Sequence, residues 1–215
     1  AFRSPNVYES YYEASGDQKS NPRIRPEKMK ALQLSFDQKF TDDLLGSLSV
    51  YNFRMIRLID LTPDMTDSLL HFINNGKANG TGLEAELRYQ PGKHVGGYIN
   101  YTLQNVKDAG GYTLTNSPAA MIKSGLNFSI GENFFISPEA FYETGRKTLE
   151  NNMTEDVRLF NITVMASDLL NHFNISLKIR NILDAEYKYP GGYEHLQDAL
   201  VQDSRSVIIK LSARF

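Results

Sequence analysis

The chain has 215 residues, of which 23 are basic and 25 are acidic, and it contains no cysteine. Because the charges nearly balance and form no block of one sign, no nucleic-acid partner is expected. The missing cysteines exclude disulfides and thiolate metal sites within this chain. No apolar run comes near the roughly 18 residues that a membrane-spanning helix needs.

Apolar and polar residues alternate along most of the chain. In the closing stretch SVIIKLSARF, every second residue from Val207 to Phe215 is apolar. A period of two places successive side chains on opposite faces of a strand, whereas on a helix it would scatter the apolar residues around the axis. The pattern predicts nine complete strands, at residues 26–40, 45–58, 76–90, 94–106, 119–130, 134–145, 157–168, 173–182 and 206–215. Residues 1–5 look like the end of a further strand.

Short and long connections alternate between these strands. The sequences FTDDL, PGKH, GEN and LLNH are tight turns of about three to five residues, as hairpins require. The long connections cover roughly residues 59–75, 106–118, 146–156 and 183–204. Successive connections of an up-and-down sheet lie at opposite ends, so all the short turns gather at one end. This asymmetry is typical of bacterial outer-membrane barrels, which have short periplasmic turns and long extracellular loops.

Aromatic residues gather near the short turns and near the end of the last strand, where membrane barrels carry an interfacial girdle. They are Phe36, Phe40, Tyr89, Phe128, Phe134, Phe173 and Phe215. A soluble sandwich or ligand-holding barrel has the same alternation but turns its apolar face inward. The segregated loops and the girdle favour an all-β fold, an antiparallel up-and-down transmembrane β-barrel.

The strand count is informative, because nine is odd and single-chain bacterial barrels have an even number of strands. An unpaired strand edge is untenable in lipid. We therefore expect residues 1–215 to be the carboxyl-terminal portion, about 9–10 strands, of a larger barrel.

Five sequence stretches resemble the TonB-dependent outer-membrane receptors, in the order in which that family has them. AFRSPNVYE followed by NPRIRPEK resembles the family's pair of boxes with FRAP and NPNL cores, and GKANGTGLEAELRY resembles its strand after an extracellular loop. NSPAAMIKSGLNF, RNILDAEYKYPGGYEH and KLSARF are similar to its later strands and terminus.

The resemblance implies a 22-stranded barrel in the bacterial cell outer membrane, around an amino-terminal plug that is absent from this chain together with the first barrel strands. It implies active import of a ferric siderophore or similar metal chelate with energy supplied through TonB. Implied partners are membrane lipid and lipopolysaccharide, the TonB complex through the missing amino-terminal part, and the barrel-assembly machinery. That machinery reads the last strand of such receptors, which here contains Leu211, Ala213 and the terminal Phe215.

The sequence offers no catalytic constellation. The four histidines, His71, His94, His172 and His195, are scattered, and no spacing suggests a metal cage, an activated nucleophile or a phosphate-binding loop. Four glutamates fall on the polar faces of predicted strands, where a water-filled lumen is polar in any case. They are Glu84, Glu86, Glu139 and Glu143. We expect neither an enzyme nor a resident cofactor or metal.

Ligand binding is expected at the extracellular end. The segment from Arg3 to Arg25 combines arginine with tyrosine, which suits an anionic, ring-bearing chelate through charge-assisted hydrogen bonds and stacking. The candidates there are Arg3, Tyr8, Tyr11, Tyr12, Arg23 and Arg25. Later loops add Tyr112, Arg146, His195 and Arg205.

Other ligands and other barrels remain alternatives. Family members that take up haem carry a histidine between the two boxes, and the stretch NVYESYYEASGDQKS has none. Tyrosinate also ligates haem iron, so Tyr8, Tyr11 or Tyr12 could substitute. A haem or vitamin-type receptor of the same family, and a passive porin or adhesion barrel, are the alternative functions.

Overall fold

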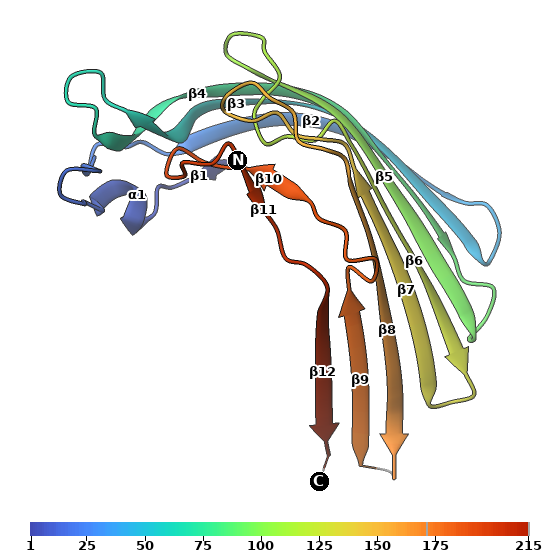
Figure 1. The fold of residues 1–215 in the computed structure, drawn as a ribbon. Helices are drawn as coiled ribbons and strands as arrows, with labels where there is room; N and C mark the ends of the chain where they lie inside the picture. The colour runs from blue at the N-terminus through green and yellow to red at the C-terminus, as the bar shows by residue number, and fades with distance from the viewer. Residues whose placement is uncertain (171, 215) are drawn as a thin grey trace.

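The computed structural model describes residues 1–170 and 172–214. Ten strands form one antiparallel sheet in the order β1-β2-β3-β4-β5-β6-β7-β8-β9-β12, and β10 pairs with β11 in a separate hairpin (Figure 1). The strands of the main sheet are β1 (Phe2–Arg3), β2 (Glu27–Lys39), β3 (Leu44–Pro63), β4 (Leu70–Tyr89), β5 (Val95–Asp108), β6 (Ala120–Ile130), β7 (Phe134–Glu143), β8 (Val157–Leu169), β9 (Phe173–Arg180) and β12 (Ser206–Ala213).

The predicted up-and-down topology is confirmed. Each of the nine predicted strands is present, and β1 supplies the strand end expected at residues 1–5 by pairing Phe2 with Lys28 and Arg3 with Glu27. The sheet curves strongly, but within the described residues β1 and β12 do not pair with each other (Figure 1). The chain is thus an open, curved part of a barrel wall.

One predicted long loop is wrong in extent. Residues 59–75 were expected to be a loop, yet β3 runs to Pro63 and β4 begins at Leu70. The strands continue past a bulge, where Arg57 has a φ of 60° and the register shifts between Ile56, Leu58 and Ile59. A bulge interrupts the alternation without ending the pairing, so the period-two pattern stopped before the strands did.

The last predicted loop, at residues 183–204, contains the hairpin of β10 (Lys188–Pro190) and β11 (Ala199–Val201). The amino-terminal segment contains a short helix, α1 (Val7–Tyr11), which the sequence pattern did not indicate. Both elements are too short to show a period. Within the described residues no helix is long and apolar enough to cross a membrane.

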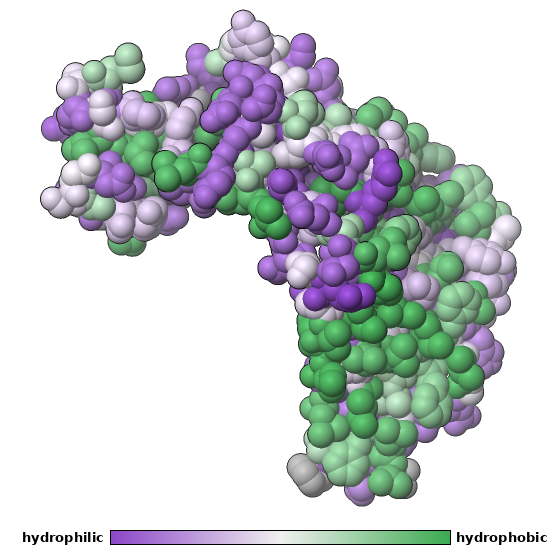
Figure 2. Space-filling model, viewed as in Figure 1, coloured by the Kyte–Doolittle hydropathy of each residue, from purple (hydrophilic) through white to green (hydrophobic). Residues whose placement is uncertain are grey.

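The apolar face of the sheet points away from the protein. Leu32, Leu34, Ile209 and Leu211 each leave more than half of their surface exposed. Among the described residues only four apolar ones are buried, namely Ile24, Ala78, Val106 and Val157. A soluble β-fold would bury its apolar face, so this exposure fits a surface covered by lipid. Figure 2 shows hydrophobic residues gathered over the strands at the carboxyl-terminal end and hydrophilic residues over the loop end.

The opposite face is polar, as predicted. Glu84 and Glu86 line a groove there together with Lys123, and the Glu139 carboxylate lies 2.9 Å from the Lys178 ammonium. Glu143 pairs in register with Met121 at the loop end of the same face.

The short connections 40–43, 90–94 and 131–133 lie at one end of the sheet and the long ones at the other (Figure 1). Six of the seven predicted girdle residues are exposed near the short-turn end, and the seventh, Phe215, lies outside the described residues. Leu211 and Ala213 pair with Ile175 and Phe173 of β9.

Candidate ligand-binding surface

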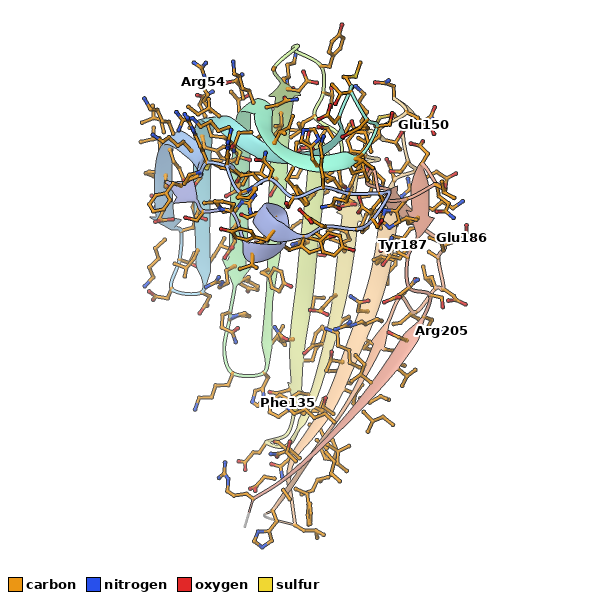
Figure 3. All side chains as sticks on the ribbon, turned by 90° about the vertical axis from the view of Figure 1, so that its left-hand side faces the viewer. Arg54, Phe135, Glu150, Glu186, Tyr187 and Arg205 are labelled. Atoms are coloured by element: carbon orange, nitrogen blue, oxygen red, sulfur yellow. The ribbon has the colours of Figure 1, made fainter. Side chains whose placement is uncertain are left out.

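Polar and aromatic side chains crowd the loop end of the sheet (Figure 3). They form two groups. The amino-terminal group comprises residues 1–25 and the outer parts of β3 and β4, and the loop group comprises the connections 109–119, 144–156 and 181–205. The two groups contain all ten predicted ligand-binding residues.

Arg3 anchors the amino-terminal group. Its Nε and Nη2 donate to the two carboxylate oxygens of Glu27 at 2.7 and 2.9 Å, and its Nη1 donates to Glu9 Oε1 at 2.9 Å. These hydrogen bonds raise the pKa of Arg3. The Arg3 hydrogen bonds also lower the pKa of Glu27, against the opposing effect of burial. Because two carboxylates already hold the guanidinium, Arg3 acts as a clamp between β2 and α1.

Helix α1 displays the tyrosines. It begins with a capping box, in which the Asn6 side chain accepts from the Glu9 N–H and the Glu9 side chain accepts from the Asn6 N–H. Tyr8 stacks on Tyr12 at 4.4 Å between ring centres and meets the Phe72 ring edge-on at 5.9 Å. Tyr11 leaves 63% of its surface exposed. The structure therefore brings together two of the three tyrosines as a stacked pair and leaves Tyr11 without a stacking partner among the described residues.

The segment after α1 docks on the β3–β4 hairpin. The Lys19 N–H donates to Leu70 O, and the Leu70 N–H donates to Asp17 O. The Lys19 ammonium lies 2.6 Å from Asp64 Oδ2 and 2.8 Å from Asp67 Oδ2. The hydrogen bond from Lys19 is the main cause that holds the pKa of both carboxyls below the ordinary range.

Arg23 and Arg25 are the available cations of this group. They flank Ile24, which is buried, and both are exposed. Asn74 fixes the local backbone, because its side chain accepts from the Arg25 N–H and donates to the Arg25 carbonyl. Within the described part of the chain neither guanidinium takes part in a hydrogen bond or an ion pair. Two arginine side chains are thus presented from a fixed backbone without a protein partner.

Arg146 is the centre of the loop group. Its guanidinium donates to both Glu143 oxygens at 3.0 and 2.8 Å and to Asn116 Oδ1 at 2.8 Å. It also lies 4.0 Å from the centre of the Tyr189 ring. Burial and the nearby Glu143 carboxylate raise the pKa of Tyr189 to about 12, so its hydroxyl stays neutral at physiological pH. Arg146 therefore joins three loops and has little surface left for a ligand.

A recess between the β7–β8 loop and the β10–β11 hairpin was missed by the sequence predictions. Asp198 holds its two walls together, because it accepts from Asn152 Nδ2 at 2.9 Å and from the Glu150 N–H at 3.3 Å. The lining residues are Thr148, Asn152, Met153, Thr154, Glu155, Glu186, Tyr187, Lys188, Asp198 and Ala199. The alternating aromatic residues of EYKYPGGY are the sequence feature that could have indicated a strand at β10.

The remaining candidates lie apart from one another on the loop surface. The Tyr112 ring is exposed, with the Lys147 ammonium 5.6 Å from its centre. His195 lies beside Glu194, at 3.4 Å, at the tip of the β10–β11 hairpin. Arg205 is 3.7 Å from Asp184 and donates to the Ile182 carbonyl.

This surface offers exposed phenol rings and two guanidinium groups that have no partner among the described residues. In general, phenol rings bind planar groups by stacking, and guanidinium groups bind anions through charge-assisted hydrogen bonds. Among residues 1–170 and 172–214, no three His, Asp or Glu side chains come close enough to hold a metal ion.

Comparison of the sequence with known proteins identifies the family to which the chain belongs. The sequence model of the family described as "TonB dependent receptor-like, beta-barrel" matches residues 1–182. The chain is 27% identical over 201 residues to a protein named vitamin B12 transporter BtuB from Vibrio cholerae serotype O1, and the match covers 90% of this chain and 31% of that relative. The chain spans about a third of the length of the curated relatives it matches.

Solved structures share the fold. The copper transporter OprC matches with a TM-score of 0.73 at 16% identity, over 100% of this chain and 36% of that chain. The pyoverdine outer membrane receptor FpvA from Pseudomonas aeruginosa PAO1, bound to pyoverdine, matches with a TM-score of 0.68 at 16% identity, over 94% and 32%. The ferric citrate transporter FecA in its unliganded form matches with a TM-score of 0.71 at 18% identity, over 88% and 32%.

Proposed function

Because the chain belongs to the TonB-dependent receptor family of outer-membrane β-barrels, we propose that the receptor containing it binds a ferric siderophore or similar metal chelate and imports it with energy supplied through TonB. The chain supplies part of the barrel wall and of the extracellular binding surface. The family consists of transport receptors rather than enzymes.

The main observation in favour of a metal chelate as the ligand is the pair of arginines Arg23 and Arg25. Both guanidinium groups lack a protein partner within the described residues, and Asn74 fixes the backbone that presents them. Tyr11 adds an exposed ring from the same segment. Ferric chelates commonly carry negative charge, and arginine binds carboxylate and phenolate oxygens through two parallel hydrogen bonds. Arg3 and Arg146 support this surface indirectly, since carboxylates already hold their guanidinium groups.

A vitamin-type ligand is the second candidate, because the relatives at 27% identity are named vitamin B12 transporters. Cobalamin is bulky and carries much less negative charge than a polycarboxylate or catecholate chelate. Its binding would therefore depend on the exposed tyrosines more than on Arg23 and Arg25.

The test is a binding and uptake assay on the full-length receptor. Purified receptor is titrated with a panel of ferric siderophores, with cyanocobalamin and with haem. We expect one ferric chelate to bind, and the double variant Arg23→Gln/Arg25→Gln to lose about 2–4 kcal/mol of binding free energy as charge-assisted hydrogen bonds disappear. The matched control is Lys93→Gln, which removes an exposed charge from a short turn at the other end of the sheet.

The uptake assay tests whether transport needs TonB, separately from whether the chelate binds. Cells that express the receptor should accumulate the labelled chelate only when TonB is present, while surface binding persists without it. Binding of cyanocobalamin alone would establish the second candidate instead. Uptake that continues without TonB would contradict active transport and support a passive barrel.

A further inference from the structure

The recess between the β7–β8 loop and the β10–β11 hairpin is acidic. Three carboxylates line it, those of Glu155, Glu186 and Asp198, against the single ammonium of Lys188. Glu155 and Glu186 are exposed at its surface. The recess therefore favours a cation over the anions that suit the arginines of the amino-terminal group.

The segments around the recess have the same bias. Residues 148–156 and 184–203 together contain eight acidic residues, one lysine and no arginine. Figure 3 shows Glu150, Glu186 and Tyr187 of these segments at the loop end of the sheet. Because a cleft with low-dielectric walls concentrates the field of the charges around it, this excess of carboxylates strengthens the attraction for a cation inside the recess.

The carboxylates of the recess differ in how far the protein already uses them. Asp198 accepts from Asn152 Nδ2 at 2.9 Å, and this hydrogen bond is the main cause that lowers the pKa of Asp198. Glu186 lies 3.5 Å from the Lys188 ammonium, and both side chains are exposed. Glu155 takes part in no ion pair or side-chain hydrogen bond among residues 1–170 and 172–214. Glu155 and Glu186 are thus the carboxylates that a ligand can use.

The adjoining three-loop junction shows how this protein holds a guanidinium group. The Arg146 guanidinium donates to the carboxylate of Glu143 and to the amide oxygen of Asn116, and it lies over the Tyr189 ring. The Tyr187 ring is a close neighbour, 5.5 Å from the Tyr189 ring between centres and nearly perpendicular to it. A carboxylate, an amide oxygen and an aromatic ring are therefore the set that binds a guanidinium in this part of the chain.

The recess contains the same three kinds of group. Glu155 and Glu186 supply carboxylates, and Tyr187 supplies a ring. Asn152 supplies an amide oxygen, because its nitrogen is the atom that is bonded to Asp198. Such a set binds an organic cation through charge-assisted hydrogen bonds and through the attraction of the cation to the ring.

The size and the apolar lining of the recess suit the end of a flexible arm. Its volume is about 290 Å³. Sites for whole small molecules usually span about 300–1,000 Å³. Met153 and Ala199 also line the recess, so methylene groups next to the cation find apolar contacts. The recess is therefore suited to one charged group on a short chain rather than to an entire metal chelate.

We propose that this recess binds an alkylguanidinium or alkylammonium group, which forms a basic arm of the transported chelate. The cation of the arm lies between Glu155, Glu186 and the Tyr187 ring. The assignment of the arm to a transported chelate rests on the proposed function. The ligand then has two opposite poles, since Arg23 and Arg25 bind its anionic part.

The first test titrates the full-length receptor with n-butylguanidinium and with n-butylurea, which has nearly the same size but no charge, and follows binding by saturation-transfer NMR. The cation should bind on the order of tenfold more tightly than the urea. Glu155→Gln/Glu186→Gln should weaken binding of the cation by on the order of tenfold, and Tyr187→Leu by about threefold. The control Asp42→Asn/Glu132→Gln removes the same charge from two short turns at the other end of the sheet, and it should bind as the parent receptor does.

Equal binding of the cation and the urea would overturn the proposal, because the recess would then recognise neutral amide or hydroxyl groups. Undiminished binding by the Glu155→Gln/Glu186→Gln variant, or equal weakening in the control, would overturn it too. Heat-modifiable migration confirms that each variant forms a barrel. If the double variant does not fold, Glu155→Gln alone replaces it and should bind the cation about threefold more weakly.

The second test asks whether the transported chelate carries the basic arm. Ferric trihydroxamates, catecholates and hydroxycarboxylates are each prepared with a free terminal amine and with that amine acetylated. One amine-bearing chelate should bind on the order of tenfold more tightly than its acetylated form, and Glu155→Gln/Glu186→Gln should remove the difference. Equal or tighter binding by the acetylated forms would overturn the basic arm. If no chelate binds in either form, the proposed function fails and the basic arm with it, whereas binding of n-butylguanidinium still decides whether the recess is a cation site.

Discussion

The guanidinium of Arg146 lies 4.0 Å from the centre of the Tyr189 ring and donates two hydrogen bonds to Glu143. Only 1% of the Glu143 side chain is exposed, and Arg146 is the only cation paired with its carboxylate among the residues that the structure describes. The arrangement joins the β7–β8 loop to the β10–β11 hairpin. Arg146 therefore has a structural role in holding these loops together.

Replacing Arg146 should loosen these loops. In the full-length receptor, Arg146→Ala leaves a buried carboxylate without its partner and should cost about 3 kcal/mol of stability. Arg146→Lys keeps the charge but not the planar fork or the stacking on Tyr189, and should cost about 1–2 kcal/mol. Denaturant unfolding in detergent, with limited proteolysis of the loops, measures both.

Arg158→Ala is the control for that series. The Arg158 side chain is 72% exposed and its nearest carboxylate oxygen, on Asp156, is 3.9 Å away. An exposed pair of this kind contributes about 0–1 kcal/mol. If the Arg146 and Arg158 variants behave alike, the three-loop junction is not a stabilising feature.

Most of the sheet could be predicted because alternation is a local property of the sequence. The pattern from Leu32 to Phe36, for example, needs only the knowledge that one face is apolar. The role of Arg146 could not be predicted in this way. Its contact with Tyr189 exists only because the β10–β11 hairpin folds back over the β7–β8 loop, and sequence spacing does not show which loops meet.

The roles of the arginines in the amino-terminal segment could not be predicted from the sequence either. Arg3, Arg23 and Arg25 look equivalent in the sequence, as exposed cations beside tyrosines. The structure separates them, because Glu9 and Glu27 converge on Arg3 whereas Asn74 contacts only the backbone of Arg25. The assignment of the ten candidates to ligand binding stays a prediction.

The docking of residues 1–25 on the β3–β4 hairpin should depend on pH. Asp64 and Asp67 have folded-state pKa values below their ordinary value of 3.8, chiefly because Lys19 donates to them. A depressed carboxyl pKa gives stability that is present above the unfolded-state value and is lost as the pH falls through the folded-state value. The segment should therefore stay docked at pH 5 to 7, on the order of one unit or more above that ordinary value, and loosen under stronger acid.

Hydrogen exchange at the Lys19 and Leu70 amides, whose N–H groups bond across this junction, reports the loosening. Asp64→Asn should speed exchange at neutral pH and reduce its dependence on acid. Asp42→Asn, in a short turn at the other end of the sheet, should change neither. Exchange at these amides that is unaffected by Asp64→Asn would show that backbone pairing alone holds the segment.

The segregation of short turns and long loops predicts the orientation in the membrane. Met65, between β3 and β4, and Leu196, between β10 and β11, are at least 99% exposed at the loop end of the sheet, whereas Asp43 and Glu132 lie in short turns at the other end. In intact cells, Met65→Cys and Leu196→Cys should react with a membrane-impermeant maleimide, and Asp43→Cys and Glu132→Cys should not. The receptor without an introduced cysteine gives the background, and permeabilised cells should label at all four positions. The reverse pattern in intact cells would invert the proposed topology.

The last strand should decide whether the barrel assembles. Leu211 lies on the apolar face of β12, pairs with Ile175 of β9, and is followed on the same face by Ala213. A charged residue there would have to enter lipid, at a cost of about 2–4 kcal/mol for a basic side chain at the bilayer centre and less for an acidic one or toward the interface. In the full-length receptor, Leu211→Asp and deletion of Phe215 should each lower the amount of heat-modifiable barrel in the outer membrane without changing synthesis. Ser212→Asp places the same charge on the polar face and should assemble normally, which separates recognition of the apolar row from a general intolerance of charge. Normal assembly of both the Leu211 and Phe215 variants would mean that the barrel-assembly machinery does not read this row.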